Sequence, residues 1–482
     1  MSSRYEFNMD RYHGVMGKFF LGPNAVSPDG SNLGNQEAVF YITQRKCPYA
    51  PVLGHSILCR SLFDSQIDAP HIRHLVEDRA DLTLLAKELQ KQGSFLGTIR
   101  LAKEGTIMFA GEPIGDVKGP LWNIQLHEVK FEHAFDIPMT VGFRAMEMRK
   151  AAGEKSFLSV FSLRRDGDSA RSLRVSEVAY ICGFNDTSDM EAAFCLGIPD
   201  VGTMAHYLAQ SFMAYQRNPE KDEKTGKTKH FERVAFEKWL DDNPKGTVLL
   251  IDTFDYKTGL VHAIQAALSS AERKAAFKAI RIDSGDLIES SLYCHKLLVL
   301  NGLENVGIIL TGDLDAQKIK EIREALPFTI YGYGIGTKLA AQVDYVAGVI
   351  FKMCQMGGMP VLKTSGTPGK ETLAGEFQVW RCLDTEGNYV KDIISLIDEP
   401  QPKGADFVSA QPLLEPFWGK GVPLYQNKSP RDLKDYLKSQ LEKFRVPLDK
   451  YPVELSPRLS ALKKEITEAI KDNQTYPEIK FE

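Results

Sequence analysis

An arginine, two carboxylates and a glycine turn lie together in residues 281–287 (RIDSGDL). Arg281 and Asp283 are two positions apart on a predicted buried strand, so their side chains share one of its faces. A guanidinium binds phosphate through paired hydrogen bonds and a carboxylate accepts from sugar hydroxyls, so the pattern indicates a site for a phosphorylated sugar. The alternative is that Asp283 or Ser284 only caps the following helix and forms an ion pair. The segment's other candidate residues are Ser284, Gly285 and Asp286.

A glycine-rich run occupies residues 332–338 (GYGIGTK). It follows a strand predicted at 328–331 and precedes a predicted helix, an arrangement in which backbone N–H groups and the helix dipole hold a phosphate. The candidate phosphate contacts are Gly334, Gly336 and Thr337. The run lacks the Walker spacing GxxxxGK[ST], and its glycines could instead serve only a tight turn.

A histidine stands at the predicted start of a helix that continues to Tyr215. His206 lies about one helical turn after Thr203, among glycines and threonine hydroxyls. A neutral ring nitrogen in such surroundings could accept a phosphoryl group, which is nucleophilic catalysis. The alternative is a structural or exposed histidine, since the chain has ten of them.

An aromatic ring precedes two arginines in residues 161–165 (FSLRR). Phe161 could stack on a flat heteroaromatic substrate while Arg164 holds that substrate's carboxylate. The alternative is a strand end followed by surface arginines.

Short apolar runs alternate with amphipathic helices between residues 245 and 352, which favours a parallel sheet or barrel. The predicted strands are 248–251, 279–282, 306–310 and 328–331, and the predicted helices are 259–278, 287–300 and 315–326. Each strand ends in a polar or glycine cluster, and the one at 311–315 adds Asp313 to the candidate residues. Since parallel folds bind substrates at the carboxyl ends of their strands, we expect the chemistry on that rim.

We predict an α/β fold with an irregular (β/α) barrel core. The predicted parts are an N-terminal α+β domain at 1–140, a catalytic barrel domain at 141–400 and a C-terminal region packed on the core at 401–482. Within the barrel domain, the charged run 217–230 is predicted to be a solvated surface loop without a function.

The composition excludes several classes of protein. Lys and Arg total 59 against 63 Asp and Glu, a balance that favours neither nucleic acid nor a membrane as partner. With 43% hydrophobic and 25% charged residues, most of the chain is not disordered. The seven cysteines are scattered and never spaced as CxxC, so neither disulfides nor a zinc site are indicated, and no side-chain metal site is predicted. Without a signal peptide or a membrane span, a cytoplasmic location is expected.

Six motifs in order along the chain resemble those of the nicotinate phosphoribosyltransferase family, a type II phosphoribosyltransferase family. They are DRYHGVM (10–16), SEVAYICGFNDTS (176–188), GTMAH (202–206), LIDTFD (250–255), RIDSGDL (281–287) and YGIGT (333–337). The tail segments 411–416 and 451–456 resemble its C-terminal region. The chain departs from the family pattern at Val15, Ser162, Tyr207 and 374–378.

The resemblance implies formation of nicotinate mononucleotide and pyrophosphate from nicotinate and 5-phosphoribosyl 1-pyrophosphate, in NAD biosynthesis. It implies ATP and Mg²⁺ as cofactors, with ATP hydrolysis coupled through a phosphohistidine at His206. It also implies a homodimer with shared active sites, because the family's counterpart of Tyr12 reaches into the neighbouring subunit.

The resemblance also assigns roles to the other candidates. Asp283 would contact the ribose and Arg281 the phosphates or the base, while the 5′-phosphate would lie against Gly334, Gly336 and Thr337. Phe161 and Tyr12 would enclose the pyridine ring, and Arg164 would hold anionic groups. Because the ribosyl carbon passes through a cationic transition state, Asp283 and Asp286 are the carboxylates expected to stabilise it.

Other functions stay open. A nicotinamide phosphoribosyltransferase resembles this chain around Thr187 but carries an aspartate at the place of Ser188, and Asp189 lies next to it. Quinolinate phosphoribosyltransferases are far shorter and lack the phosphohistidine. A barrel lyase or isomerase acting on a phosphosugar would also use the rim glycines and Asp283. A non-enzymatic scaffold would show more degraded motifs.

Overall fold

The computed structural model describes residues 9–27, 29–63, 73, 80–92, 95–214, 220–223, 225–341, 346–366 and 370–472. Its internal contacts divide the chain into two compact units. Unit 1 comprises Met1–Phe143 and Asp344–Glu482, and unit 2 comprises Arg144–Val343. Unit 2 is therefore a continuous insertion into unit 1, a division different from the three consecutive parts that the sequence predicts.

Unit 2 is built on a six-stranded parallel sheet in the order β7-β6-β11-β10-β9-β8. The strands are β6 (Phe157–Val160), β7 (Asp186–Thr187), β8 (Thr247–Leu250), β9 (Phe277–Ile282), β10 (Gly307–Leu310) and β11 (Gly332–Ile335). Their side chains form a buried apolar interior, for example Leu249, Ile280 and Ile335. The sheet is an open half-barrel with β7 and β8 at its edges, which confirms the predicted α/β fold class.

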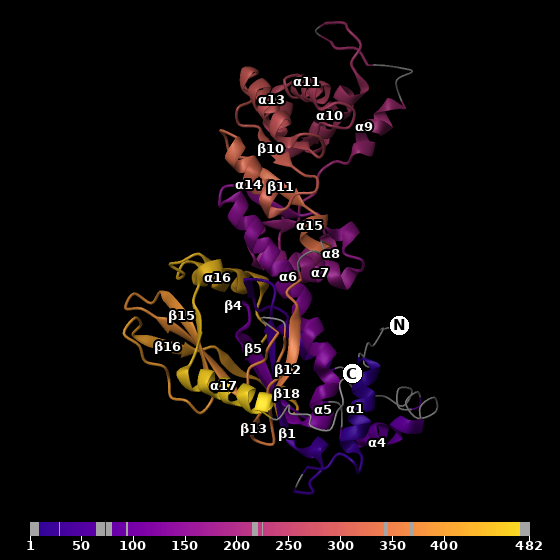
Figure 1. Cartoon of the computed structure of the whole chain (residues 1–482). Helices are drawn as coiled ribbons and strands as arrows, with labels where there is room; N and C mark the ends of the chain where they lie inside the picture. The colour runs from indigo at the N-terminus through magenta and orange to yellow at the C-terminus, as the bar shows by residue number, and fades with distance from the viewer. Residues whose placement is uncertain are drawn as a thin grey trace, which may run out of the picture. The chain divides into compact units, whose positions relative to one another are not determined.

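Helices connect the strands of unit 2 (Figure 1). They are α7 (Ser169–Ile181), α8 (Met190–Leu196), α9 (His206–Met213), α10 (Phe231–Asp242), α11 (Tyr256–Ala267), α12 (Ala271–Ala276), α13 (Leu287–Leu300), α14 (Ala316–Ala325) and α15 (Thr337–Ala340), with the 3₁₀ turn η4 (Leu163–Arg165). Aspartates cap several of them, since Asp255, Asp286 and Asp315 accept hydrogen bonds from backbone N–H groups in the first turns of α11, α13 and α14. Helices 287–300 and 315–326 are thus confirmed.

Two predicted elements are wrong. The strand predicted at 328–331 lies instead at Gly332–Ile335, so the glycine-rich run is itself a strand for four residues. Its glycines permit close packing against the neighbouring strands, an effect that β-propensity alone does not show. The helix predicted at 259–278 ends at Ala267, since Ser270 caps the short helix α12 and β9 begins at Phe277.

Unit 1 contains a seven-stranded sheet in the order β13-β12-β1-β5-β3-β17-β18. The strands are β1 (Glu37–Gln44), β3 (Thr98–Ala102), β5 (Pro113–Pro120), β12 (Val349–Met356), β13 (Met359–Pro360), β17 (Leu414–Gly419) and β18 (Val422–Pro423). Neighbours in this sheet pair antiparallel. The early strands β1, β5 and β3 therefore lie in the centre, with late strands on both sides.

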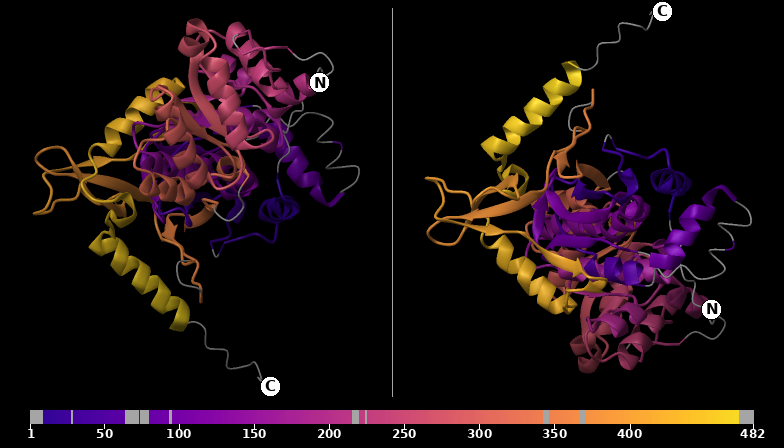
Figure 2. Two further views of the ribbon diagram at one scale, coloured as in Figure 1. Left: turned by 90° about the horizontal axis from the view of Figure 1, so that it is seen from above. Right: turned by 90° about the horizontal axis from the view of Figure 1, so that it is seen from below.

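Smaller sheets and helices complete unit 1. The sheets are β16-β14-β15-β19 (Ser409–Pro412, Phe377–Leu383, Tyr389–Leu396, Val453–Leu455) and β2-β4 (Tyr49–Pro51, Ile107–Phe109). The helices are α1 (Arg11–Leu21), α2 (His55–Phe63), α4 (Thr83–Gln92), α5 (Leu121–Ile124), α16 (Pro430–Leu441) and α17 (Pro457–Asp472). Helix α6 (Glu128–Ala152) begins in unit 1 and continues into unit 2. The 3₁₀ turns are η1 (Leu33–Asn35), η2 (Ala80–Leu82), η3 (Gln125–His127) and η5 (Leu448–Lys450). Figure 2 shows α17 as the brightest yellow helix, and it contacts β15. The region after residue 400 thus contributes strands to both larger sheets of unit 1.

A buried ion pair joins the strands of the four-stranded sheet. Arg381 on β14 donates to both carboxylate oxygens of Asp392 on β15, at 3.0 and 2.7 Å, and to the carbonyl of Ile107 at 2.8 Å. The Tyr451 hydroxyl donates to the same carboxylate at 3.0 Å. Since both charged groups are buried and hydrogen-bonded, each depends on the other.

Candidate functional site

Two aspartates follow the neighbouring strands β8 and β9 at their carboxyl ends. The Oδ2 atom of Asp252 accepts hydrogen bonds from the backbone N–H of Asp283 at 2.9 Å and from the Ser284 hydroxyl at 2.6 Å. Its Oδ1 atom is buried and accepts no hydrogen bond from the described residues. Asp252 therefore fixes the turn after β9 and leaves one carboxylate oxygen unpaired.

The next strand end, after β10, also contacts the Asp283 carboxylate. The Thr311 hydroxyl donates to Oδ1 of Asp283. Asp313, two residues further on, is exposed and has a φ of +47°, a left-handed conformation that aspartate tolerates better than most residues. Strained backbone of this kind is often found in binding loops.

Arg281 is the last residue but one of strand β9, close to the same rim. It donates through Nη1 to the Thr203 hydroxyl, and its Nε atom is buried without an acceptor among the described residues. Burial lowers the pKa of Arg281, the carboxylates of Asp283 and Asp252 raise it, and the charge of Arg164 lowers it further. Asp283, Asp252 and Arg164 are therefore all within electrostatic reach of Arg281.

His206 is the first residue of α9, as predicted. Its Nδ1 atom lies 3.2 Å from the hydroxyl oxygen of Thr253, which directly follows Asp252. The side chain is partly exposed, and no hydrogen bond of its Nε2 atom is found within the described part of the chain. Held at Nδ1, the ring presents Nε2 as its free nitrogen.

Phe161 follows β6, and its backbone N–H donates to the carbonyl of Ile335 at 2.8 Å. Its ring lies against Gly334 on β11, where an added Cβ would be 2.5 Å from Cε2 of the ring. An added Cβ on Gly336 would lie 2.9 Å from the Phe161 carbonyl oxygen. Both glycines thus allow Phe161 to approach β11, a role other than the predicted phosphate contact. That contact stays a prediction.

Ser188 follows the edge strand β7 and is partly buried. Its backbone N–H donates to the carbonyl of Val160 at 2.9 Å, which places it beside the strand that leads to Phe161. The adjacent Asp189 is already engaged: Oδ1 accepts from the backbone of Glu191 and Ala192, and Oδ2 accepts from the Ser172 hydroxyl at 2.6 Å. Ser188 is therefore the more available of the two side chains.

The remaining candidates in unit 2 lie in turns at the strand ends. Asp286 caps α13, since its Oδ1 accepts from the backbone of Ile288 and Glu289. The helix cap that was the alternative interpretation of this segment thus belongs to Asp286, and neither Asp283 nor Ser284 provides it. Three further candidates are placed by backbone geometry alone, namely Gly285 with a φ of +79°, Thr337 at the start of α15 and Arg164 in η4.

Tyr12 lies in unit 1, on α1. Its hydroxyl donates to Oε2 of Glu128 at 2.8 Å, and its side chain is 48% exposed. The buried His13 lies 3.1 Å from the same oxygen. Burial and the Glu128 carboxylate raise the pKa of Tyr12, so the phenol keeps its proton. The ring is thus held by its polar end and lies against the His13 ring, with centroids 3.9 Å apart, while part of the side chain stays open to solvent.

The sequence prediction omitted three residues from the site. Asp252, Thr253 and Thr311 contact Asp283, His206 or Ser284 directly. Each of the three belongs to a polar cluster that directly follows a predicted strand. That position in the sequence could have identified them as site residues. Of the four departures from the family pattern, Ser162 is accommodated by a buried hydrogen bond of 3.0 Å from its hydroxyl to Asp166.

Comparisons with known proteins agree with the geometry of the rim. Residues 158–390 match the model of the nicotinate phosphoribosyltransferase (NAPRTase) family. The chain is 29% identical to the nicotinate phosphoribosyltransferase of Bacillus subtilis over 384 residues, covering 73% of this chain and 74% of that protein. It is 26% identical to the human nicotinate phosphoribosyltransferase over 353 residues, covering 65% of each chain.

The fold is shared with solved structures. The crystal structure of human nicotinic acid phosphoribosyltransferase superposes with a TM-score of 0.76 at 22% identity, covering 95% of this chain and 100% of that one. Nicotinate-nucleotide pyrophosphorylase from Pyrococcus furiosus gives 0.68 at 19% identity, over 92% and 97%. None of the helices described is long and apolar enough to cross a membrane. In its matched central region, in its relatives and in its fold, the chain is similar to the nicotinate phosphoribosyltransferase family, a family of enzymes.

Proposed function

We propose that the protein transfers the phosphoribosyl group of 5-phosphoribosyl 1-pyrophosphate to nicotinate, forming nicotinate mononucleotide and pyrophosphate in NAD biosynthesis. The observation that carries the proposal is the meeting of Arg281, Asp283 and Asp252 at the carboxyl ends of β8 and β9. A guanidinium with an unpaired Nε suits phosphate, and carboxylates suit ribose hydroxyls. The names of the relatives support the choice of nicotinate.

In this reaction the bond from ribose C1′ to pyrophosphate breaks, and the pyridine nitrogen forms a bond to the same carbon. The carbon becomes cationic as the leaving group departs, so a nearby negative charge lowers the barrier. Asp283 supplies that charge, held in place by the Thr311 hydroxyl. Asp286 contributes through the loop that it fixes by capping α13.

The donor set of the rim fits Mg²⁺, which prefers carboxylate oxygens and water. The unpaired Oδ1 of Asp252 and the carboxylate of Asp283 are the side chains that would hold it. When bound, the ion neutralises charge on the pyrophosphate. Arg281, near the end of β9, shares that task.

ATP coupling forms the second part of the proposal. Nε2 of His206 attacks the γ-phosphorus of ATP, the bond from that phosphorus to the β–γ bridging oxygen breaks, and ADP leaves. Water later cleaves the N–P bond and releases phosphate. The hydrogen bond between Nδ1 and Thr253 supports Nε2 as the nucleophile. A phosphoryl group on His206 adds about two negative charges next to Thr253, which changes the affinity for anionic substrates.

Base recognition is assigned to Phe161, Arg164 and Ser188. The Phe161 ring stacks on the pyridine, and Arg164 pairs with the carboxylate. The neutral Ser188 hydroxyl donates to that carboxylate, whereas an aspartate there would repel it. Both oxygens of the adjacent Asp189 already accept hydrogen bonds from the chain, which leaves Ser188 as the side chain available to the base.

Product analysis tests the proposal directly. The protein is incubated with 5-phosphoribosyl 1-pyrophosphate, Mg²⁺ and either nicotinate or nicotinamide, with and without ATP, and the mononucleotides are separated by chromatography. We expect nicotinate mononucleotide as the main product, with a rate that ATP increases, and no product from an Asp283→Asn variant. Faster conversion of nicotinamide would assign the alternative base. If neither mononucleotide forms, a lyase or isomerase would be favoured.

We also propose that the active sites are shared in a homodimer, with Tyr12 of one copy stacking on the pyridine bound by the other. The partial exposure of its side chain supports this role. Tyr12→Ala and Asp283→Asn are each expected to be poorly active alone. Mixed dimers of the two should regain activity, because one of the two sites is then intact; verified mixed dimers without a gain would show that each site is self-contained.

A further inference from the structure

Two histidines and a glutamate come together in unit 2, outside the residues assigned to the reaction. They are His230, which directly precedes α10, Glu232 in its first turn and His262 on α11. Figure 1 shows α10 and α11 side by side, and the two helices are in extensive contact. One possible metal-ligand atom from each of the three side chains lies within 4.8 Å of the other two.

Glu232 is the buried member of the cluster, with 1% of its surface exposed. Its Oε2 atom lies 2.7 Å from Nδ1 of His262. Its Oε1 atom is buried and has no hydrogen-bond partner among the described residues. A buried carboxylate oxygen without a donor is costly, so it points to a cation that the protein chain itself does not provide.

The two imidazoles are suited to bind such a cation. Their rings stack with centroids 4.2 Å apart at an interplanar angle of 15°. His230 is exposed and His262 nearly buried, so one side of the cluster is open to solvent.

We propose that His230, Glu232 and His262 bind a divalent transition-metal ion of the zinc type. Two imidazoles and one carboxylate are a donor set that Zn²⁺ accepts with a fourth ligand from water, whereas Mg²⁺ and Ca²⁺ prefer oxygen ligands. Zinc bonds of about 2.0–2.2 Å require the three ligand atoms to draw together, through a small rotation of the stacked rings. The open side at His230 admits the ion and the water.

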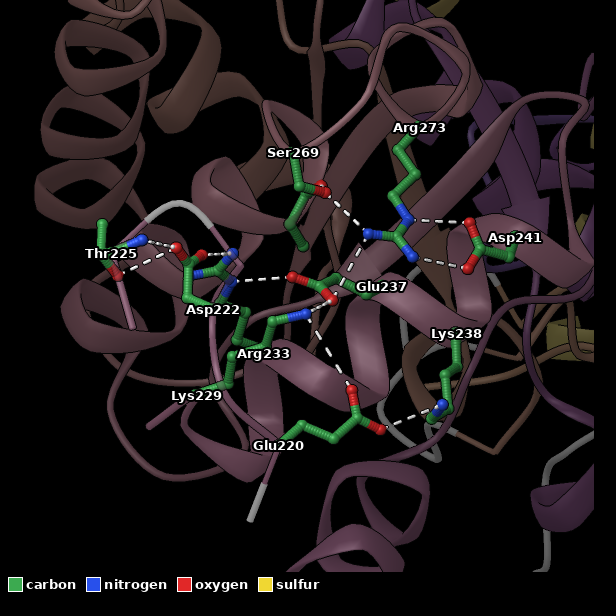
Figure 3. A network of polar contacts seen from close by, with 11 residues as sticks. Glu220, Asp222, Thr225, Lys229, Arg233, Glu237, Lys238, Asp241, Ser269 and Arg273 are labelled. Carbon is green, nitrogen blue, oxygen red and sulfur yellow. Dashed lines mark hydrogen bonds and ion pairs between the residues drawn. The ribbon is translucent and has the colours of Figure 1, made fainter. Parts of the chain in front are cut away.

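The backbone around the cluster is held independently of any metal. Figure 3 shows the network: Lys229, next to His230, pairs with Glu237 at 2.6 Å, and Arg233 pairs with Glu237 at 2.8 Å and with Asp222 at 2.6 Å. This part of the run 217–230, predicted to be a solvated loop, is thus tied to α10. Since the ion pairs fix the start of α10, metal binding needs little reordering of the chain.

Bound metal would join α10 to α11 near the phosphorylation site. Phe231, beside His230, packs edge-on against Phe254 with ring centroids 5.4 Å apart. Phe254 directly follows Thr253, the partner of His206. The ion would therefore stabilise the segment after β8 that holds His206, and it would take no part in the transfer chemistry itself.

Metal titration of the full-length protein tests the proposal without reference to catalysis. After removal of metals by chelation, wild-type protein is titrated calorimetrically with ZnCl₂ and separately with MgCl₂, and Co²⁺ is added to follow the visible absorption of a four-coordinate site. We expect one Zn²⁺ site that MgCl₂ does not fill and that gives intense cobalt bands. His262→Ala should weaken zinc binding at least tenfold and abolish those bands.

Two further variants make the test independent of folding defects. His230→Asn keeps a side chain that can cap α10 but removes the imidazole, and it should also lose affinity at least tenfold. His295→Ala is the matched control, because His295 stacks on Phe328 away from the cluster and should leave binding unchanged. Wild-type protein without a zinc site, or zinc binding equal in wild type and both cluster variants, would overturn the proposal.

Discussion

The ring of Phe161 occupies the space in which a side chain on Gly334 would lie. A Cβ at Gly334 would come within 2.5 Å of the ring and 2.6 Å of the Thr311 methyl group. Gly334→Ala must therefore displace the ring, and we expect KM for nicotinate to rise about tenfold or more with a smaller change for 5-phosphoribosyl 1-pyrophosphate. Gly332→Ala on the same strand is the control, since its Cβ would meet nothing closer than 3.4 Å. Equal KM values in the two variants would show that the ring does not stack on the base.

Ser188→Asp should change the choice of base. Two like charges brought together in a partly buried site cost a few kcal/mol, and each 1.4 kcal/mol is about a factor of ten. We expect kcat/KM for nicotinate to fall at least about tenfold, while the slow nicotinamide reaction is spared or improved. Competition assays with both bases measure the ratio. An unchanged ratio would show that Ser188 does not face the ring substituent.

His206→Asn should abolish phosphorylation of the protein. With γ-labelled ATP and Mg²⁺, wild-type protein should carry an acid-labile, base-stable label, and hydrolysis in base should release histidine phosphorylated on Nε2, because Thr253 holds Nδ1. His295→Asn should retain the label. If the label persists in His206→Asn, His206 is not the phosphorylated residue. If the phosphate is on Nδ1, the hydrogen bond between Nδ1 and Thr253 is not kept during the reaction.

Arg381→Met should strongly destabilise unit 1. The change leaves the Asp392 carboxylate buried without its charged partner, and such a loss costs about 3–5 kcal/mol. Arg458→Met breaks the exposed pair with Asp398 at 2.7 Å and should lower the stability far less, because water screens both charges. Urea denaturation gives both values. Similar values for the two variants would contradict the role assigned to the buried pair.

Glu112 makes the free energy of unfolding depend on pH. Burial and the neighbouring Asp392 raise the pKa of Glu112 well above 4.5. The folded protein therefore keeps a proton that the unfolded chain releases, and stability falls as pH rises above about 4.5. Glu112→Gln mimics the protonated form and does not titrate. The free energy of unfolding of the variant minus that of wild type should therefore increase from pH 5 to pH 8, by at most about 1.4 kcal/mol per pH unit. A constant difference over this range would show that Glu112 does not titrate there.

The sequence predicts the rim better than it predicts the strands behind it. Polar clusters after β8, β9 and β10 were found because each follows a short apolar run, and parallel pairing brings such ends together. The position of β11 was missed, because residues 328–331 have the higher β-propensity while the true strand is rich in glycine. Gly334 on that strand is explained by Phe161 and Thr311, neighbours that are distant in sequence.

The hydrogen bonds within the site depend on contacts that no local pattern specifies. Asp252 and Asp286 are both aspartates after strands, yet one holds the turn of the next strand and the other caps a helix. Similarly, His230 was placed in a charged run without periodicity, while its partner His262 comes from the next helix along the chain. Residue types identified the candidates, and the tertiary fold decided which of them meet.

The order of strands in the large sheet of unit 1 delays its assembly during synthesis. β1 pairs with β12 and β3 pairs with β17, so each early strand waits for a partner made about 300 residues later. At rates of about 5–20 residues per second, the open edges of β1 and β3 stay without their partners for roughly 15–60 s, while all of unit 2 emerges from the ribosome. Exposed strand edges pair readily with other chains. The nascent chain should therefore depend on chaperones that bind its first 140 residues, and unit 2 should acquire its fold before unit 1 does.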